Sequence, residues 1–553
     1  RQQNIFFSVK ELFAYPTIKS LALVVQIFGY TPSDFELVTL PQYQLNNQFG
    51  KIKDIKNIYP LSPMQSGFLF QALYAPDSDT YFVQSVLHLT GEVEASALER
   101  AWQNVVDQHD ILKSGVVWED LELPLQYVLE QTRLPFALHD FSNLDESIQQ
   151  IQIKEFIQAD RKKPFNLNTP PLTRVNLIKL KDDHYVMVWS FHHILLDGWA
   201  ATIVLGEVLQ GYRDIINHKY PKLVGKRPYK DYIAWLLQKD MEKAERFWRE
   251  YFVGLESPTK LSFKGLITNN IERDYEVASF NLVSEETVKL QEFASNHNLT
   301  LNSILIGVLG IVLQRYTNQQ DIVIGMTTSG RSIELPGVED MVGLFINTLP
   351  IRIKDIPNHL PTYLQELQKN IRQADECGYV SLAQVQSWSG IGQGLFDVLF
   401  VFENYPYNES DESSLRISKF EGVEKTEYPL SIVVIPGKEI HIKISYQTEH
   451  FNKEIINKFY GHFIKILETI VDTPDTKISQ VSLLTANEQH QLLTEWNTTE
   501  ATYPEDRCIH ELFEEQVEKT PDAIAVVYED KSLTYRELNE KSSQLAHYLR
   551  KQG

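Results

Sequence analysis

One short stretch of the chain, residues 190–199, constrains the fold more than any other. Ahead of it, residues 185–189 form a run of β-forming residues behind the turn-like segment 181–183. Behind it, residues 200–212 carry apolar side chains at helical spacing. Two histidines, an aspartate and a glycine therefore lie where a buried strand ends and a helix is about to begin. Such junctions often present polar groups to a cleft, because loops on a rigid scaffold carry function.

Length and charge narrow the class of protein. A chain of 553 residues is too long for one hydrophobic core. A net charge of -21 without basic stripes argues against a nucleic-acid partner. We find no apolar run of about 18 residues that could span a membrane and no signal peptide, so we expect a cytoplasmic protein. The chain starts without Met and ends inside a helical pattern, and we expect it to be a piece of a longer polypeptide.

The two cysteines, Cys377 and Cys508, lie far apart in the sequence. This spacing predicts neither a disulfide framework nor a CxxC metal site. We therefore expect no bound metal.

The first residues predict two short helices. Ser8 and Glu11 form a capping-box pattern, Pro16 ends the first helix, and Thr17 can cap a second helix over residues 18–26. The segment "FSVKELFAYPTIKSLA" resembles the last two helices of a carrier domain of nonribosomal peptide synthetases. By this resemblance, residues 1–28 are a short helical carrier remnant, and the serine that takes the phosphopantetheine arm lies upstream of Arg1. Residues 29–56 lack periodicity, which is typical of a linker.

Residues 57–485 alternate between strand and helix patterns, which predicts two α/β lobes, at 57–225 and 226–485. Helices are expected at residues 95–108, 200–212, 284–296, 302–316 and 453–471, and strands at 81–89, 185–189, 321–326, 396–402 and 440–447. Residues 486–507 are polar and predict a second linker. The closing segment, 508–553, resembles the start of an adenylation domain, including its "LTYREL" element. The resemblance covers none of the ATP-binding or acid-selecting parts.

Four ordered elements now point to one family. "HHILLDG" fits the HHxxxDG motif of nonribosomal peptide synthetase condensation domains, and "RPYKDYIAW", "IGMTTSGR" and "VGLFINTLP" resemble three further elements of that family. The resemblance implies a mixed α/β (α+β) fold of two chloramphenicol-acetyltransferase-like lobes arranged in a V. It also implies amide-bond formation between an upstream aminoacyl or peptidyl thioester and a downstream aminoacyl thioester. Phosphopantetheine arms of upstream and downstream carrier domains would hold both substrates, and the adenylation domain would be a partner in cis.

The reaction needs alignment more than activation, because a thioester is already reactive. A neutral imidazole can take the proton that the attacking amine releases, or it can hydrogen-bond and orient that amine. By resemblance this residue is His193. The sequence leaves both roles open.

The resemblance implies framing roles for the rest of the motif. His192 would point to the opposite face of the strand and serve as a structural hydrogen-bonding histidine. Asp197 would form a buried ion pair with Arg331 of the "SGR" element. Gly198 suits a position that requires an unusual φ or a close approach of the backbone to the pantetheine arm.

Two further residues are candidates for the substrate tunnel. Asn347 can hydrogen-bond within the tunnel or cap a strand end, and Trp199 can line the tunnel or belong to the core. The chain also departs from the family, because its "QHDILKS" segment has Gln108 and Lys113 where the family pattern RHExLRT has arginines. A lysine lacks the bidentate fork of arginine, so we expect weaker anion contacts there.

Rival functions share the motif or the fold. An epimerization domain carries a similar HHxxxDG, but the adenylation start behind residue 507 favours condensation. A dual epimerization and condensation domain would show an extra histidine-rich motif, which residues 57–89 do not contain. A non-catalytic docking module would lack the paired histidines, and a coenzyme A acyltransferase would not be fused to carrier and adenylation pieces. A carrier directly upstream favours an L-configured donor, whereas "LSPMQSGFLF" resembles the subgroup that accepts D-donors, so the donor configuration stays open.

Overall fold

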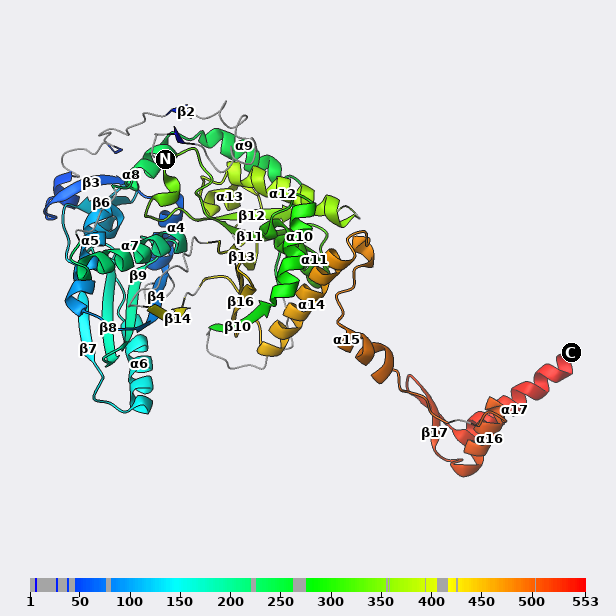
Figure 1. Ribbon diagram of the computed structural model, residues 1–553. Coiled ribbons are helices and arrows are strands. Elements are labelled where there is room, and N and C mark those ends of the chain that lie inside the picture. The colour runs from blue at the N-terminus through cyan, green and yellow to red at the C-terminus, as the bar shows by residue number, and fades with distance from the viewer. Residues whose placement is uncertain are drawn as a thin grey trace. The chain divides into compact units, whose positions relative to one another are not determined.

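The computed structural model describes residues 5–6, 26–27, 37–38, 45–75, 81–219, 225–261, 275–354, 357, 359–392, 394–404, 416–423, 426–502 and 504–553. The chain divides into two compact units, Arg1–Leu483 and Leu484–Gly553. The first unit contains two large β-sheets, each covered by helices (Figure 1). The predicted mixed α/β fold with two lobes is therefore confirmed.

The N-terminal lobe is built on a five-stranded sheet. Its strand order is β14-β4-β9-β8-β7, with β7 parallel to β8 and the other pairs antiparallel. The strands are β14 (Arg416–Val423), β4 (Phe82–Thr90), β9 (His184–His192), β8 (Thr173–Lys181) and β7 (Phe136–Asp140). The central strand β9 is buried on both faces, which explains its nearly continuous run of apolar residues.

Alternation along β9 divides the lobe into two layers. Tyr185, Met187 and Trp189 point into the main core of the lobe, which also contains α5 (Ala95–Gln108) and α7 (Gly198–Ile216). Figure 1 shows these two helices next to each other. The intervening residues Val186 and Val188 pack in a smaller cluster that contains Ile153 of α6 (Glu146–Arg161).

Shorter elements complete the lobe. They are α4 (Pro63–Tyr74), the turn η2 (Asp110–Lys113), α8 (Lys230–Leu237) and a three-stranded sheet of β3 (Ile55–Pro60), β6 (Leu125–Leu129) and β5 (Ser114–Val117). Residues 45–49 form the helical turn η1 (Leu45–Phe49), and buried Phe49 packs edge-on against Tyr127. This end of the predicted 29–56 linker is therefore packed against the lobe.

The C-terminal lobe has a six-stranded sheet of order β10-β16-β15-β13-β11-β12. The strands are β10 (Tyr275–Leu282), β16 (Ile440–Gln447), β15 (Leu430–Ile435), β13 (Val398–Phe402), β11 (Ile322–Thr328) and β12 (Asn347–Ile353). The helices are α9 (Met241–Tyr251), α10 (Ser284–Asn296), α11 (Leu301–Thr317), α12 (Leu360–Glu376), α13 (Leu382–Trp388) and α14 (Lys453–Asp472), with turns η3 (Val338–Asp340) and η4 (Ile478–Gln480).

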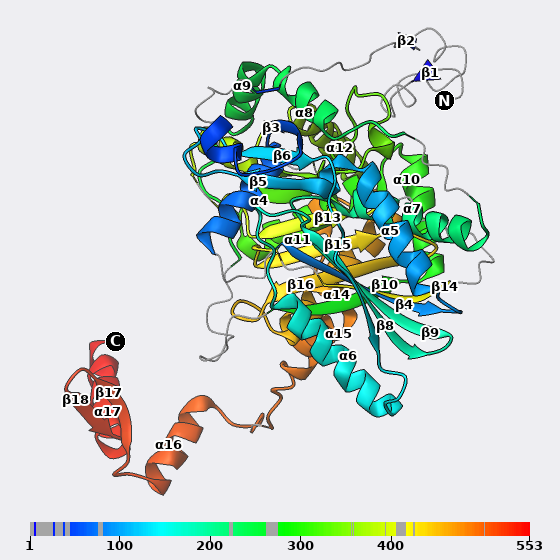
Figure 2. The same ribbon diagram turned by 90° about the vertical axis from the view of Figure 1, so that its left-hand side faces the viewer.

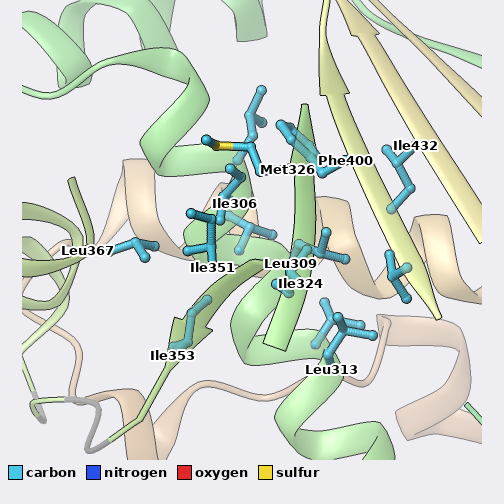
Figure 3. Packing of buried hydrophobic residues seen from close by; sticks show 14 of the residues in the cluster. Ile306, Leu309, Leu313, Ile324, Met326, Ile351, Ile353, Leu367, Phe400 and Ile432 are labelled. Atoms are coloured by element: carbon cyan, nitrogen blue, oxygen red, sulfur yellow. The ribbon is translucent and has the colours of Figure 1, made fainter. Parts of the chain in front are cut away.

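Helix α11 forms the centre of this lobe. Thr300 and Ser303 make a capping box at its start, and Asn318 ends it in a left-handed conformation with φ 52°. Figure 3 shows its buried side chains against strands β11, β12, β13 and β15. A helix that is apolar all round is expected in the middle of a large core.

Three findings differ from the predicted lobe boundary at residue 225. Helix α8 belongs to the N-terminal core through Tyr232 and Ile233, so the two cores divide after α8. Strand β14 then returns from the second half of the chain and pairs with β4 (Figure 2). Residues 335–345 likewise contribute Leu335, Val338 and Phe345 to the N-terminal core.

The remaining elements lie at the ends of the chain. Residues Ile5–Phe6 (β1) and Gln26–Ile27 (β2) form an antiparallel pair, so Gln26 lies in a strand where the sequence predicts the end of a helix. Most of the two predicted carrier helices lies outside the described residues. The unit Leu484–Gly553 contains α15 (Ala486–His490), η5 (Gln491–Glu495), α16 (Ile509–Lys519), the β17 (Ile524–Tyr528) and β18 (Lys531–Thr534) hairpin, and α17 (Tyr535–Gln552). The first part of the predicted 486–507 linker is thus helical.

Candidate functional site

The polar motif lies on one tight turn between β9 and α7. The strand ends at His192, whose N–H donates to the Leu172 carbonyl at 3.0 Å. The N–H of His193 donates to the Tyr81 carbonyl at 2.9 Å, and α7 begins only five residues later, at Gly198. The structure therefore brings His192, His193, Asp197 and Gly198 together at the end of a buried central strand.

The imidazole of His193 is held in one orientation. Its Nδ1 lies 2.7 Å from the Leu196 carbonyl oxygen, and its ring packs 5.1 Å from the ring of Phe68. Because a carbonyl oxygen can only accept, Nδ1 carries the proton of this hydrogen bond. In the neutral ring the lone pair is then on Nε2. The side chain is buried, with 6% of the residue exposed.

His192 has a different environment on the same turn. Its Nδ1 accepts a hydrogen bond from the N–H of Ile194 at 3.1 Å, so this nitrogen must be unprotonated. Burial, together with the neighbouring His193, lowers the pKa of His192 to about 3. The ring is therefore neutral at ordinary pH and stabilises the turn as an acceptor.

This neutral histidine predicts a pH-dependent stability. The unfolded ring has an ordinary pKa of 6.5 and the folded ring one of about 3, so below pH 6.5 the unfolded state binds the extra proton. Stability should fall as the pH drops from 6.5 towards 3, by about 2 kcal/mol at pH 5 from this group alone. Urea unfolding of wild type and His192→Asn at pH 7.5 and pH 5 measures the effect.

The asparagine side chain can still accept from the N–H two residues on, but it does not titrate. We expect His192→Asn to lose less stability than wild type between the two pH values. Equal losses would show that His192 does not contribute to the acid sensitivity.

Asp197 connects the turn to the second half of the chain. Its Oδ1 caps α7 by accepting from the N–H of Ala200 at 2.7 Å, and its Oδ2 accepts from the N–H of Phe345 at 2.9 Å. The guanidinium of Arg331 lies 3.5 Å from Oδ1, and both side chains are almost fully buried. One carboxylate thus holds the helix start, the 343–345 segment and a buried cation together.

Arg331 is fixed on several sides. Its Nη1 donates to the carbonyls of Val338 and Met341 at 2.5 and 2.9 Å, and its guanidinium lies 4.2 Å from the ring centre of Phe345. Burial lowers the pKa of Arg331, and the Asp197 carboxylate raises it. An arginine keeps its proton under both influences, so the pair is ionic.

A glycine allows this approach. Gly330 has φ +64°, and a Cβ built there would lie 1.8 Å from the backbone oxygen of Phe345. No other residue type fits such a contact without moving the backbone. For Gly198 the sequence predicts either an unusual φ or a close backbone approach to the pantetheine arm. Gly198 is not among the residues with positive φ, because Asp197 ends the extended segment and Gly198 is already the first residue of α7. The close approach stays a prediction.

The two tunnel candidates have partners of their own. The Asn347 amide nitrogen donates to the carbonyls of Gly378 and Val380, each at 2.7 Å, and its Oδ1 accepts from the N–H of Thr348 at 2.9 Å. These contacts favour the strand-end role over the tunnel role. Trp199 donates from Nε1 to the Glu339 carbonyl at 3.0 Å, and the Arg331 guanidinium lies 5.5 Å from its ring centre. Trp199 therefore belongs to the surroundings of the ion pair.

Sequence reasoning missed a buried amide network beneath the turn. Gln65 of α4 donates to the Ile194 carbonyl at 3.1 Å and to the Gln126 side chain at 2.7 Å. Gln126 in turn donates to the Tyr59 hydroxyl at 2.9 Å and to Ser114 at 3.0 Å. The sequence indicates this network only through Gln65, which follows the helix cap Ser62 by three residues and lies on the helix face that also buries Phe68.

Within the described residues, no three His, Cys, Asp or Glu side chains lie in a group that could hold a metal ion. No single described helix is long and apolar enough to cross a membrane. Helices α10 and α11, which are joined at a sharp bend, reach the necessary length and apolar composition only when they are taken together.

Comparisons with known proteins agree with this geometry. The family model "Condensation domain" matches residues 55–493, and the model "AMP-binding enzyme" matches residues 513–553. The chain is 39% identical over 533 residues to one of the linear gramicidin synthase proteins of Brevibacillus parabrevis, covering 95% of this chain and 7% of that protein. It is 35% identical over 531 residues to bacitracin synthase 3 of Bacillus licheniformis, covering 95% and 8%. The chain thus spans less than a tenth of the length of either relative.

Solved structures share the fold. The starter condensation domain of rhizomide synthetase RzmA superposes with a TM-score of 0.66 at 16% identity, over 80% of this chain and all of that one.

Proposed function

Since the chain belongs to the condensation-domain family, which it matches from residue 55 to residue 493, we propose that it forms an amide bond between two carrier-bound substrates. The donor is an aminoacyl or peptidyl thioester, and the acceptor is the α-amino group of an aminoacyl thioester. The relatives are peptide synthases, which supports this reaction class. The start of an AMP-binding domain behind the site supports an adenylation domain in cis.

The observation that carries the proposal is the fixed tautomer of His193. With Nδ1–H donated to the Leu196 carbonyl, Nε2 has the lone pair that can accept a proton. An α-amino group has a pKa of about 7.7–8.0, so a useful fraction is neutral near pH 7 and can attack. Nε2 can take the proton that this nitrogen releases, or it can hold the amine in line with the thioester carbon.

The other motif residues hold this histidine in place. Asp197 fixes the turn because it caps α7 and accepts from the N–H of Phe345. Arg331 pairs with Asp197 and holds its carboxylate in place. His192 accepts from the turn itself and stays neutral. None of these three groups needs to exchange a proton with the substrates.

The burial of His193 favours substrates on slender arms. A folded carrier domain is too large to reach the side chain of a residue that is 6% exposed, whereas a thin phosphopantetheine arm can reach it. The arm supplies the thioester linkage. We assign residues 1–28 to an upstream carrier domain, 57–485 to the condensation domain and 508–553 to the adenylation domain, with linkers between them.

A reconstitution assay tests the function. Carrier domains are loaded with a defined donor and a defined acceptor, the protein is added, and dipeptidyl carrier is measured by mass spectrometry. We expect dipeptide only when the donor, the acceptor and the protein are all present. Separate reactions with L- and D-configured donors assign the donor subgroup by their relative rates.

Two outcomes would contradict condensation. Inversion of the donor's α-carbon without dipeptide would indicate an epimerization domain. The absence of both products with fully loaded carriers would indicate a docking module.

A further inference from the structure

Two sequence elements that the condensation reaction does not use meet at a polar cavity. The cavity has a volume of about 250 Å³. It lies between the end of α5 with the following turn η2, the start of β3, and the start of α8. The "QHDILKS" segment, which departs from the family pattern, supplies Gln108, His109 and Asp110 to its wall. The "KRPYKDY" segment supplies the opposite wall.

The lining is strongly cationic for a chain with a net charge of -21. The residues that line the cavity include four with basic side chains and one with a carboxylate, namely Lys56, Lys226, Arg227, Lys230 and Asp110. Lys56 lies on β3 and Lys230 is the first residue of α8, while Lys226 and Arg227 lie on the segment that leads into α8. Such a concentration of positive charge raises the local concentration of anions.

Ion pairs neutralise only part of this charge. Lys56 pairs with Asp110 at 2.9 Å, and Arg227 lies 3.6 Å from Asp231. Lys226 and His109 both contact the single carboxylate of Glu207. Among the described residues, Lys230 has no acidic group within ion-pair distance, so positive charge is left over at this wall.

Two further features suit a small anion. Helix α8 starts at this wall, where Tyr229 and Lys230 line the cavity and no side chain caps the helix, while Asp231 in its first turn offsets part of the positive end of the helix dipole. The Gln108 amide adds a neutral hydrogen-bonding group to the opposite wall. The cavity volume is below the roughly 300–1,000 Å³ of pockets that enclose drug-sized ligands. It is several times the roughly 30 Å³ that one molecule occupies in liquid water. A phosphate group fits this size.

We propose that this cavity is a binding site for a phosphate dianion, separate from the histidine turn and independent of the proposed condensation activity. At neutral pH a phosphomonoester carries a charge of about -1.5 to -2, which complements the excess of cations. Charge-assisted hydrogen bonds to lysine and arginine are the contacts that recognise such a group. The ligand is free inorganic phosphate or the terminal phosphate of a larger molecule.

Calorimetric titration of the full chain with inorganic phosphate at pH 7.5 tests the proposal, with sodium chloride holding the ionic strength constant. We expect saturable binding by wild type and about tenfold weaker binding by Lys230→Gln, the loss expected for one charge-assisted hydrogen bond. The matched control is Lys154→Gln on the exposed face of α6, which should bind phosphate like wild type. A parallel titration with AMP distinguishes the two sources of phosphate.

A gain-of-function variant protects the test from a folding failure. Gln108→Arg restores the arginine of the family pattern and adds a bidentate donor to the cavity wall, so it should bind phosphate more tightly than wild type. Thermal unfolding with and without phosphate should show the same order of variants. The proposal is overturned if wild type shows no saturable binding, or if Lys230→Gln and Lys154→Gln bind phosphate equally.

Discussion

Replacing His193 with alanine is expected to lower the rate of dipeptide formation by about 100- to 10,000-fold, the range that a positioned acid or base contributes. The reason is geometric, because the Nδ1–H contact to the Leu196 carbonyl fixes the Nε2 lone pair in one direction, and alanine has no such group. The mass-spectrometric assay with loaded carriers measures the rate. Circular dichroism and thermal unfolding of the variant establish that it is folded.

A second variant separates the two roles of this histidine. The amide of His193→Gln can hydrogen-bond an amine, but it cannot take up a proton near neutral pH. If His193 only positions the amine, the glutamine variant should keep much of the rate, whereas a general base leaves it as slow as the alanine variant. His441→Ala, at an exposed position of β16, is the control and should have the wild-type rate. Wild-type rates from His193→Ala would remove His193 from the mechanism.

Replacing Asp197 with alanine is expected to lower the free energy of unfolding by about 3–5 kcal/mol, the usual cost of leaving a buried charge without its partner. The Arg331 guanidinium stays buried, and the N–H groups of Ala200 and Phe345 lose their acceptor at the same time. Urea unfolding followed by fluorescence measures the loss. Reduced activity of this variant would therefore report folding as well as catalysis.

A double-mutant cycle isolates the ion pair. Arg331→Met alone should also destabilise, but Asp197→Ala combined with Arg331→Met should cost clearly less than the two single changes together, because no uncompensated charge is left. Asp197→Asn keeps the cap of α7 and should fall between wild type and Asp197→Ala. Strict additivity would show that the two side chains do not stabilise each other.

Local periodicity predicted the helices well. The predicted helices at 95–108 and 284–296 have the bounds of α5 (Ala95–Gln108) and α10 (Ser284–Asn296), because their apolar residues recur at helical spacing and each ends at a clear break. Strand β16 (Ile440–Gln447) was also predicted with its observed bounds, since its residues alternate between buried and exposed. In each of these elements the pattern and the tertiary environment favour the same structure.

Contacts between residues far apart in the sequence could not be predicted from these local patterns. Nothing in residues 416–423 indicates that β14 pairs with β4, more than 300 residues earlier in the chain. The Asp197 and Arg331 partnership was likewise predicted from family resemblance, because 134 residues separate the two side chains. Gln65 was overlooked because a glutamine on a helix is usually exposed, and only its tertiary partners reveal the network.

The return of the chain to the N-terminal lobe determines which pieces of such a synthetase can be exchanged. A recombination point between α8 and α9 looks natural from the order of elements, yet it would separate β4 from its edge partner β14. It would also separate Asp197 from Arg331 and from the N–H of Phe345. We expect a hybrid to keep these contacts most readily when residues 329–345 and 416–423 come from the same parent as the histidine turn. The site is therefore built from three separate chain segments, and no single recombination point transfers all of them together.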